Sequence, residues 1–297
     1  MDVIIKLTGG LGNQMFQYAY ARSIAIKNKC ELYIDDTYYT NQPSADTIRK
    51  LELTQFHIQD FKYASVHQRK NMRIYAWFIK IKRRLGVLGR LFPLPQNIVT
   101  PDCPHDIPHD KYETSYIGQF QTHANAIKIS QQLRSHFILN DKMLKLAHST
   151  SLYRDIDDFC GTVALHIRRG DYVSNANASK HHGVMKLNYY YKALSYLTQN
   201  KKITKIIVFS DDIEWVRNNL YIDNDVLYYS SEYGQEYASV DLYLMSLCNH
   251  FIIANSSYSW WAAWLGRFDD KIVIAPGQWN NYNTHSPVLD EWIKIYE

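Results

Sequence analysis

The second half of this chain alternates between two periodicities, and that alternation restricts the fold more than any other feature. Short apolar segments are typical of buried strands, and the segments between them repeat their apolar residues at helical spacing. A strand that is apolar on both faces has to be covered on both sides, so this order predicts a parallel sheet between two layers of helices. The expected strands are 163–167, 205–210, 226–229, 251–254 and 271–275, and the expected helices are 187–198, 212–220, 235–248 and 257–265.

The first half opens in the same way but then loses its regularity. A strand at 2–7, a glycine-rich turn, a helix and a strand at 31–35 follow one another, and a proline-rich stretch comes later, at 92–110. We interpret that stretch as a long connection within a first domain. The sequence therefore predicts two α/β domains. They span 1–150, with a basic and proline-rich insertion at about 55–112, and 151–297.

The glycine-rich turn, LTGGLGNQMFQYAYA at 7–21, differs from both common phosphate-binding turns. A dinucleotide fingerprint needs a third glycine where this chain has Met15, and an acid after the second strand, for which Asp35 and Asp36 are the candidates. A P-loop needs Gly-Lys-Ser/Thr, which is absent from this turn. Neither motif is therefore predicted here.

Two interpretations of this turn remain. Asn13 is able to cap the helix that follows, which makes the segment an ordinary tight turn. Alternatively, the glycines allow the backbone to approach a ligand closely, with polar side chains at the helix N-terminus beside it. The residues of that candidate site are Gly10, Gly12, Asn13 and Gln14.

Two adjacent arginines follow the first strand of the second half, in ALHIRRGDYV at 164–173. His166 and Arg168 share one face of that strand, Arg169 points to the other, and Asp171 follows closely. Ligands of open parallel sheets bind at the carboxyl ends of strands, where the arginines stand. A structural ion pair would explain one of them. Because a guanidinium contacts phosphate oxygens through two parallel hydrogen bonds, the pair together indicates a phosphate site.

A second candidate anion site lies in NHFIIANSSYSWWAAWLG, at 249–266, where a strand runs directly into a helix. Ser256 or Ser257 is able to cap that helix, and the free N–H groups of a helix start form a site for phosphate. Capping without a ligand is the ordinary case, but two anion sites at one sheet edge favour a diphosphate ligand. Three tryptophans of this helix are expected to pack on the sheet rather than to bind sugar: Trp260, Trp261 and Trp264.

Asp241 falls on the packed stripe of the expected helix 235–248. An unpaired buried carboxylate is too costly, so this side chain needs a partner. Ordinary partners are an arginine or a set of backbone N–H groups.

Charge is distributed unevenly along the chain. The net charge is +4, but the segment 69–90 holds eight Lys and Arg and no acid, so a generally nucleic-acid-binding protein is not indicated. This segment is a candidate amphipathic helix for an anionic membrane, or equally a solvated helix packed on its own domain.

With no run of eighteen apolar residues, we expect a cytoplasmic protein, with peripheral contact at the inner face of the cytoplasmic membrane as an alternative. Four distant cysteines are expected to be reduced: Cys30, Cys103, Cys160 and Cys248.

Four motifs together resemble a known family. In this order and spacing, they are similar to those of the bacterial α-1,2-fucosyltransferases of glycosyltransferase family 11, from residue 9 to about 265. The basic and proline-rich stretch at 69–110 carries none of them. The motifs are GGLGNQMFQYA (9–19), HIRRGDY (166–172), FSDD (209–212) and SSYSWWAAWL (256–265).

The resemblance implies a GT-B-like fold, with two Rossmann-like domains whose parallel sheets face each other across a cleft. It implies transfer of L-fucose from GDP-β-L-fucose, with inversion, to the 2-hydroxyl of a terminal β-galactose of a surface glycan of the O-antigen or capsule type. The first domain would serve the acceptor and the second would bind GDP-fucose. By motif, the donor would contact His166, Arg168, Arg169, Ser210, Asp211, Asp241, Ser256, Ser257 and Tyr258, with Gly10, Gly12, Asn13 and Gln14 on the acceptor side. With GDP as the carrier, guanine is a better-matched partner for Asp241, because its N1–H and exocyclic amine are adjacent donors that one carboxylate accepts together. Selection of a guanine nucleotide by Asp241 is therefore one hypothesis.

The chemistry of GDP departure agrees with these roles. A cation and a helix start aimed at the diphosphate stabilise the charge that develops there, and a metal could do the same. The resemblance implies that no metal is required, and no cofactor is expected. Two Asp-x-Asp sequences, 155–157 and 223–225, precede strands and thus lie at the wrong end for ligands. Arg168 and Asp171 are the catalytic candidates. Asp171 is either the general base or an ion-pair partner of an arginine, and a strongly dissociative transition state needs no strong base.

Two alternative functions stay open at this point. With 14% aromatic residues and 24 tyrosines, the chain would suit a non-catalytic glycan-binding protein, but such a protein has no use for a diphosphate site. A transferase of another nucleotide sugar is the second alternative, and a panel of donors distinguishes it.

Overall fold

The computed structural model describes residues 2–42, 47–85, 98–100, 114–155, 158–174, 180, 183–281 and 286–296. The chain forms two compact units, and it passes from the first into the second more than once. The first unit comprises Met1–Leu53 and Ile58–His136, and the second comprises Thr54–His57 and Phe137–Glu297.

In its described part, the first unit contains a five-stranded parallel sheet of order β3-β2-β1-β5-β4. The central strand, β1, is buried because its residues Val3, Ile4 and Ile5 have no exposed surface. The strands are β1 (Val3–Lys6), β2 (Leu32–Asp35), β3 (Lys62–Tyr63), β4 (Ile98–Val99) and β5 (Thr114–Ile117). Because β3 and β4 belong to this sheet, the stretch 55–112 is not only an insertion but also supplies its two edge strands.

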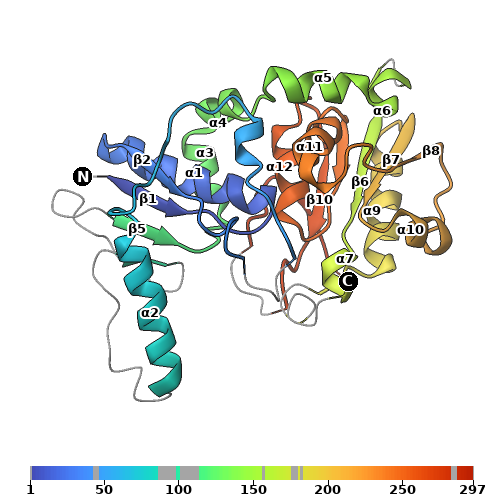
Figure 1. Ribbon diagram of the computed structural model, residues 1–297. Coiled ribbons are helices and arrows are strands. Elements are labelled where there is room, and N and C mark those ends of the chain that lie inside the picture. Colours follow the sequence, from blue (N-terminus) through green and yellow to red (C-terminus); the bar gives the residue numbers. More distant parts are fainter. Residues whose placement is uncertain are drawn as a thin grey trace. The chain divides into compact units, whose positions relative to one another are not determined.

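Helices cover this sheet unevenly. The long helix α1 contacts β1, β2 and the short α3. Helix α2 contacts β4 and β5 and then points away from the sheet (Figure 1). The helices of this unit are α1 (Leu11–Asn28), α2 (Lys70–Leu85), α3 (His123–Lys128) and α4 (Ser130–His136), with the 3-10 turn η1 (Leu53–Gln55) at the passage between the units.

The second unit contains, in its described part, a six-stranded parallel sheet of order β11-β10-β9-β6-β7-β8. The predicted parallel sheet is confirmed, and β7 has the expected bounds; the edge strand β11 was not expected. The strands are β6 (Thr162–Ile167), β7 (Lys205–Ser210), β8 (Val226–Tyr229), β9 (His250–Ile252), β10 (Val273–Pro276) and β11 (Ile293–Ile295).

Helices pack on both faces of this second sheet. Val163, Leu165 and Ile167 of β6 share a core with residues of α9 and α10, while His166 points to the other face, toward α12. On that face α11 contacts both α12 and α5 (Figure 1). The helices are α5 (Asp141–Ser149), α6 (Ser151–Asp155), α7 (Gly170–Ser174), α9 (Leu187–Asn200), α10 (Ile213–Asn219), α11 (Ala238–Ser246) and α12 (Ser257–Leu265), preceded at α11 by the 3-10 turn η3 (Gln235–Tyr237).

The short segment 54–57, which interrupts the first unit, pairs antiparallel with the chain that begins the main part of the second unit. Phe56 bridges Leu139, and the backbone N–H groups of His57 and Asn140 donate to the carbonyls of Ile138 and Gln55 at 2.8 and 2.9 Å. The division in the structure therefore falls at residue 136, with 54–57 on the far side of it, whereas the sequence suggested a boundary after 150. Helix α5 belongs to the second unit as a result.

Candidate active site

The carboxyl ends of β6 and β7 lie side by side, because these strands pair in register with Ile167 opposite Ser210. Arg168, the residue after β6, therefore meets Asp211, the residue after β7. Its Nη1 lies 2.7 Å from Asp211 Oδ2, and the other oxygen of this carboxylate accepts a hydrogen bond from the backbone N–H of Arg169 at 2.8 Å. One carboxylate thus fixes both the guanidinium and the turn that carries it.

Gly170 is required by this arrangement. A Cβ atom at position 170 would collide with Oδ2 of Asp211, so a larger residue would displace the carboxylate. Gly170 also begins the short helix α7, which was not expected from the sequence. Asp171 lies in α7, but its side chain lies outside the described part of the structure, so its assignment as base or ion-pair partner stays a prediction. The carboxylate that pairs with Arg168 belongs to Asp211.

Gly170→Ala is expected to destabilise the protein by about 1–3 kcal/mol, the usual range for overpacking, and to lower kcat by moving the Asp211–Arg168 pair. Urea unfolding and steady-state kinetics measure the two effects. In the Asp211→Ala background the colliding carboxylate is gone, so the same glycine substitution should have little further effect there. Equal losses in both backgrounds would contradict the steric explanation.

Arg169 is held by the start of α10. Its Nε lies 3.2 Å from Asp212 Oδ2, and its guanidinium carbon lies 3.5 Å from the centroid of the Trp215 ring. Asp212 also caps α10 by accepting a hydrogen bond from the Trp215 N–H, and its own N–H donates to Ser210 Oγ. From the sequence we expected a structural ion pair for one of the two arginines. The structure shows an ion pair for each of them. The stacking residue Trp215 was missed, since no local sequence signal links it to Arg169.

His166 is buried and electrically neutral. Burial, together with the charge of Arg168, lowers its pKa from 6.5 to about 3. Its Nδ1 has no hydrogen-bond partner among the described residues, and its ring centroid lies 5.9 Å from that of Tyr258. A neutral imidazole is able to donate or accept one hydrogen bond at each nitrogen, according to its tautomer, but it brings no charge to the site.

The start of α12 adjoins the end of β6, because β6 pairs with β9 and Tyr172 OH donates to the carbonyl of Asn255 at 3.2 Å. Ser256 occupies the N-cap in an extended conformation, yet its side chain makes no capping hydrogen bond, unlike the expected serine cap. Ser257 is the first helical residue. Tyr258 OH donates to the carbonyl of Ala238 at 2.8 Å and so ties α12 to α11.

The tryptophans of α12 are packing residues, as expected. All three are buried, and the Trp260 Nε1–H donates to the carbonyl of Pro287 at 2.8 Å.

Asp241 lies on α11 and finds hydroxyl partners. Tyr229 OH donates to its Oδ1 at 2.8 Å, and the Ser231 side chain is a second donor. Burial raises the pKa of Asp241 from 3.8 to about 6, although these two hydrogen bonds oppose the rise. The two hydroxyl partners belong to neither of the ordinary classes considered from the sequence, arginine or backbone N–H. Neither could have been identified before the strand order was known, since Tyr229 ends β8 and Ser231 lies just after it.

In the first unit, the glycine turn is shaped by Gly9 and Gly10. Gly9 has φ +76°, and a Cβ there would lie 2.7 Å from Asn13 Nδ2. Helix α1 begins at Leu11 with Gly10 as its N-cap, so the alternative in which Asn13 caps the helix is wrong. Asn13 Oδ1 instead accepts a hydrogen bond from Gln121 Nε2 at 2.7 Å, which connects the turn to the loop after β5.

Gln14 is fully buried and holds the backbone of a second segment. Its Nε2 donates to the carbonyls of Gly9 and Lys50, and its Oε1 accepts from the N–H groups of Glu52 and Leu53 at 2.9 and 3.0 Å. The amide therefore shapes the turn instead of facing a ligand.

Arg49 lies beside the glycine turn, although no motif had pointed to it. Its Nε would be 3.7 Å from a Cβ atom added at Gly10. Gly12 is buried within α1.

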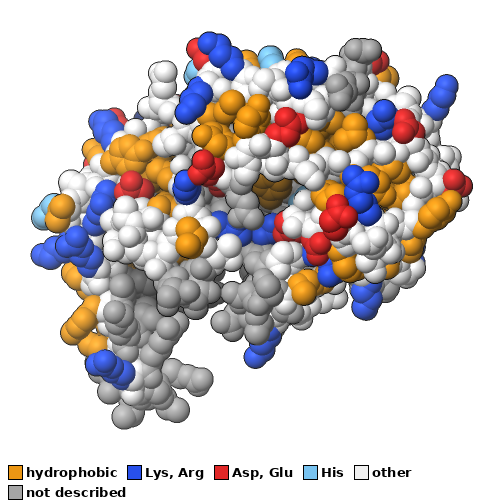
Figure 2. Space-filling view, turned by 45° about the vertical axis from the view of Figure 1, so that its right-hand side comes forward, with side chains coloured by type: hydrophobic (Ala, Val, Ile, Leu, Met, Phe, Trp, Pro, Cys, Tyr) orange, Lys and Arg blue, Asp and Glu red, His pale blue; other side chains and the backbone are white. Residues whose placement is uncertain are grey.

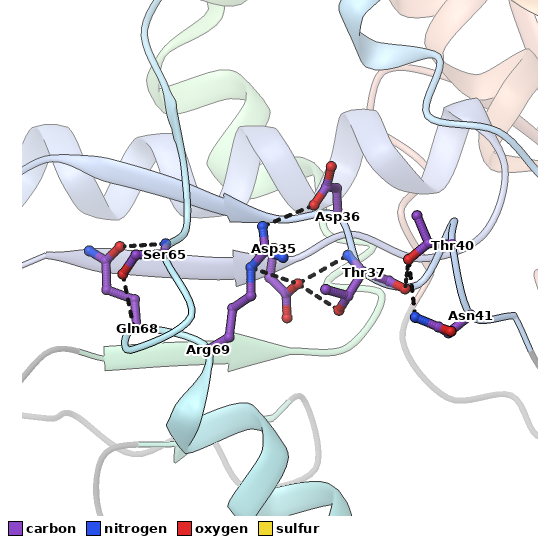
Figure 3. Close-up of polar contacts among 8 residues, drawn as sticks. All are labelled: Asp35, Asp36, Thr37, Thr40, Asn41, Ser65, Gln68 and Arg69. Carbon is purple, nitrogen blue, oxygen red and sulfur yellow. Dashed lines mark hydrogen bonds and ion pairs between the residues drawn. The ribbon is translucent and has the colours of Figure 1, made fainter.

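Asp35 and Asp36, the acids considered for a dinucleotide fingerprint, are used locally (Figure 3). Asp35 is buried and accepts hydrogen bonds from the N–H and Oγ1 of Thr37 at 3.1 and 2.7 Å. Arg69 lies 3.6 Å from Asp35 and 3.2 Å from Asp36, just before α2 begins. These contacts agree with the rejection of that fingerprint, because the acids fix the end of β2 to the start of α2.

Among the described residues, no group of three or more His, Cys, Asp or Glu side chains is placed to hold a metal ion. Asp225, in the second Asp-x-Asp sequence, lies before β8 and pairs with Lys205 at 3.3 Å. It therefore lies at the amino end of the sheet, as expected. The first such sequence lies partly outside the described residues.

Comparison with known sequences agrees with the geometry. A sequence model described as "Glycosyl transferase family 11" matches residues 107–296. The O-antigen biosynthesis glycosyltransferase WbnK of Escherichia coli is 36% identical over 303 residues, which cover 97% of this chain and 99% of the relative. An alpha-1,2-colitosyltransferase of Escherichia coli is 32% identical over 300 residues, covering 99% and 98% of the two chains.

Solved structures show the same fold at low sequence identity. A mutant of Arabidopsis thaliana FUT1 in complex with GDP matches with a TM-score of 0.52 at 11% identity, over 92% of this chain and 70% of that one. POFUT1 in complex with GDP matches with a TM-score of 0.51 at 10% identity, over 92% and 97%. The expected GT-B-like fold is thereby confirmed.

Proposed function

Since this chain belongs to glycosyl transferase family 11, we propose that it transfers L-fucose from GDP-β-L-fucose to the 2-hydroxyl of a terminal β-galactose. The acceptor is a bacterial surface glycan of the O-antigen type, in line with the name of the relative WbnK. Colitose from its GDP carrier is the second candidate donor sugar, since another relative of similar identity is named an alpha-1,2-colitosyltransferase.

The observation that carries this proposal is the Arg168–Asp211 pair at the carboxyl end of β6, next to the start of α12. The guanidinium carbon of Arg168 lies 5.6 Å from the ring centroid of Tyr172, whose hydroxyl reaches Asn255 just before α12. A guanidinium carries five N–H donors, so it is able to hold a carboxylate and phosphate oxygens together. A fixed cation and a helix start at one sheet edge are suited to a diphosphate.

The reaction follows from this arrangement. The acceptor 2-hydroxyl oxygen forms a bond to fucose C1 while the bond from C1 to the β-phosphate oxygen breaks, and the electron pair leaves with GDP. Attack from the face opposite GDP inverts the configuration at C1. Arg168 and the N–H groups at the start of α12 stabilise the charge that grows on the diphosphate. The hydroxyl proton passes to Asp171 or, with a dissociative transition state, to solvent.

The second unit also recognises the nucleotide in this proposal. Asp241 accepts the two adjacent donors of guanine, and His166 serves the nucleoside side as a neutral hydrogen-bonding group. The hydroxyls of Tyr229 and Ser231 orient the carboxylate. The glycine turn of the first unit belongs to the acceptor side.

A donor and acceptor panel tests the proposal. Purified protein is incubated with GDP-fucose, GDP-colitose, GDP-mannose and UDP-galactose, together with lacto-type, lactosamine and Galβ1,3GalNAc acceptors, and products are identified by mass spectrometry and NMR. An α-1,2-linked fucosyl product is the expected result. Transfer from GDP-colitose alone would show that colitose, and not fucose, is the donor sugar. The absence of transfer from every GDP-sugar would reject the proposal.

Transfer is expected to persist in excess EDTA, because Arg168 and the α12 start already supply the positive potential that a divalent cation would otherwise supply. Initial rates with and without EDTA give the comparison. Complete loss of activity that manganese restores would indicate a metal-dependent mechanism instead.

A further inference from the structure

Helix α2 exposes apolar side chains although its first turns pack on the sheet. Met72 is 3% exposed and packs with Ile4 and Ala64, whereas Ile74 and Trp77 are 42% and 63% exposed. At 100° per residue, Ile74 lies about 200° around the helix from Met72, so it faces away from the first unit. α2 therefore has a packed face and an apolar face without cover.

Basic side chains accompany this exposed face. The segment 61–101 contains no Asp or Glu, and α2 alone contains six Lys and Arg. Five exposed residues lie within an arc of about 100° on α2. We call them the α2 surface; they are Lys70, Arg73, Ile74, Trp77 and Arg84.

The charge of the α2 surface differs from that of the second unit on the face that Figure 2 shows. Over the second unit, on the right of Figure 2, Lys/Arg and Asp/Glu side chains are interspersed. At the lower left, where α2 lies, basic and hydrophobic side chains adjoin one another. The α2 surface thus combines basic side chains, without acids among them, with exposed apolar side chains.

We propose that the α2 surface attaches this protein to a membrane whose surface carries anionic phospholipids. Lys and Arg near such a surface are attracted to the headgroup phosphates. Trp77 and Ile74 enter the boundary between headgroups and acyl chains, where the amphipathic indole ring is favoured. A nucleic acid would match the charge but not the exposed isoleucine, and the core of a protein interface is depleted in charged residues.

The attachment is peripheral. Within the described part of the chain, no helix is long and apolar enough to cross a membrane. This inference does not depend on the donor or the acceptor, because the α2 surface lies on α2 alone.

Co-sedimentation of the full chain with lipid vesicles tests the inference. The protein is expected to sediment with vesicles of equal parts phosphatidylglycerol and phosphatidylcholine at low salt, to be released at high salt, and to stay in solution with phosphatidylcholine alone. The combined change Arg73→Gln and Arg84→Gln should lower the partition coefficient about 25-fold, because each basic charge contributes about 1 kcal/mol, or about fivefold. Trp77→Ala should lower it about tenfold.

Tyr221→Ala is the matched control, since Tyr221 is an aromatic residue 76% exposed in the second unit. This variant should partition like the parent protein, and every variant should keep the parent midpoint of urea unfolding if its fold is intact. Three outcomes would overturn the inference: no partitioning into anionic vesicles, equal partitioning into neutral vesicles, or equal loss in the Tyr221 control. A concentration-dependent dimer that Trp77→Ala abolishes, seen by ultracentrifugation, would assign the α2 surface to a second copy of the chain instead.

Discussion

Arg168→Lys is expected to lower kcat at least about a hundredfold, the effect typical of a lost transition-state donor. Lysine keeps the positive charge but places it on a single ammonium group, which cannot contact Asp211 and two phosphate oxygens in one plane. Because the charge on GDP is largest in the transition state, kcat should fall more than the affinity for GDP-fucose. Stopped-time assays of fucosyl transfer, with GDP binding measured by calorimetry, give the two quantities.

Arg217→Lys is the matched control for this experiment. Arg217 also lies over an aromatic ring, with its guanidinium carbon 4.3 Å from the centroid of Tyr228, but it lies on α10, outside the proposed site. This variant should retain the parent activity. Near-parent turnover in Arg168→Lys would remove Arg168 from the mechanism, and similar losses in both variants would indicate a general effect on folding.

Asp241→Asn is expected to weaken GDP binding by about 2 kcal/mol, or about thirtyfold, the usual contribution of a hydrogen bond to a charged group. Asparagine keeps the shape of the side chain but turns one acceptor toward guanine into a donor that faces a donor. The weaker affinities for UDP and ADP should change much less, because those bases do not present the same pair of donors. Calorimetric titration with the three nucleotides measures this difference.

A pH titration separates base recognition from misfolding. Because the pKa of Asp241 is about 6, the carboxylate is ionised above that pH and protonated below it. GDP affinity of the parent protein should therefore fall as the pH is lowered through about 6, and Asp241→Asn should lose this dependence. The exposed Asp223→Asn serves as control and should behave like the parent. If Asp241→Asn binds GDP as tightly as the parent, base recognition lies elsewhere.

Much of the second unit was determined by local sequence alone. The bounds of β7 and α12 agree with those expected. β7 is an apolar run bounded by polar residues, and α12 is a nearly continuous apolar segment that is buried on all sides, so each has to lie inside the unit. The same patterns put Arg168 and Ser256 after buried strands, and parallel strands bring their carboxyl ends to one edge. For these reasons the position of the candidate site was predictable.

The partners within that site were decided by tertiary structure. Arg168 pairs with Asp211 because of the register between β6 and β7. From the sequence, the nearer Asp171 was either a general base or an ion-pair partner of one of the two arginines, and that prediction stays open. Gln14 reaches the backbone at Glu52, far along the chain, and so shapes the glycine turn from inside. No local pattern encodes such pairs, since each depends on which strands become neighbours.

For the cap of α1 and for the edge strands of the first sheet, the local sequence was compatible with more than one structure. Asn13 was a good capping residue, but the helix begins about one turn earlier, at Leu11, with Gly10 in the N-cap position. The two-residue strands β3 and β4 are too short to give an alternating pattern, and they exist because β2 and β5 offer them unpaired backbone groups. The sequence by itself thus determined most elements of the second unit and the sheet edge at which the candidate site lies, whereas only the packing of distant segments decided which side chains meet there.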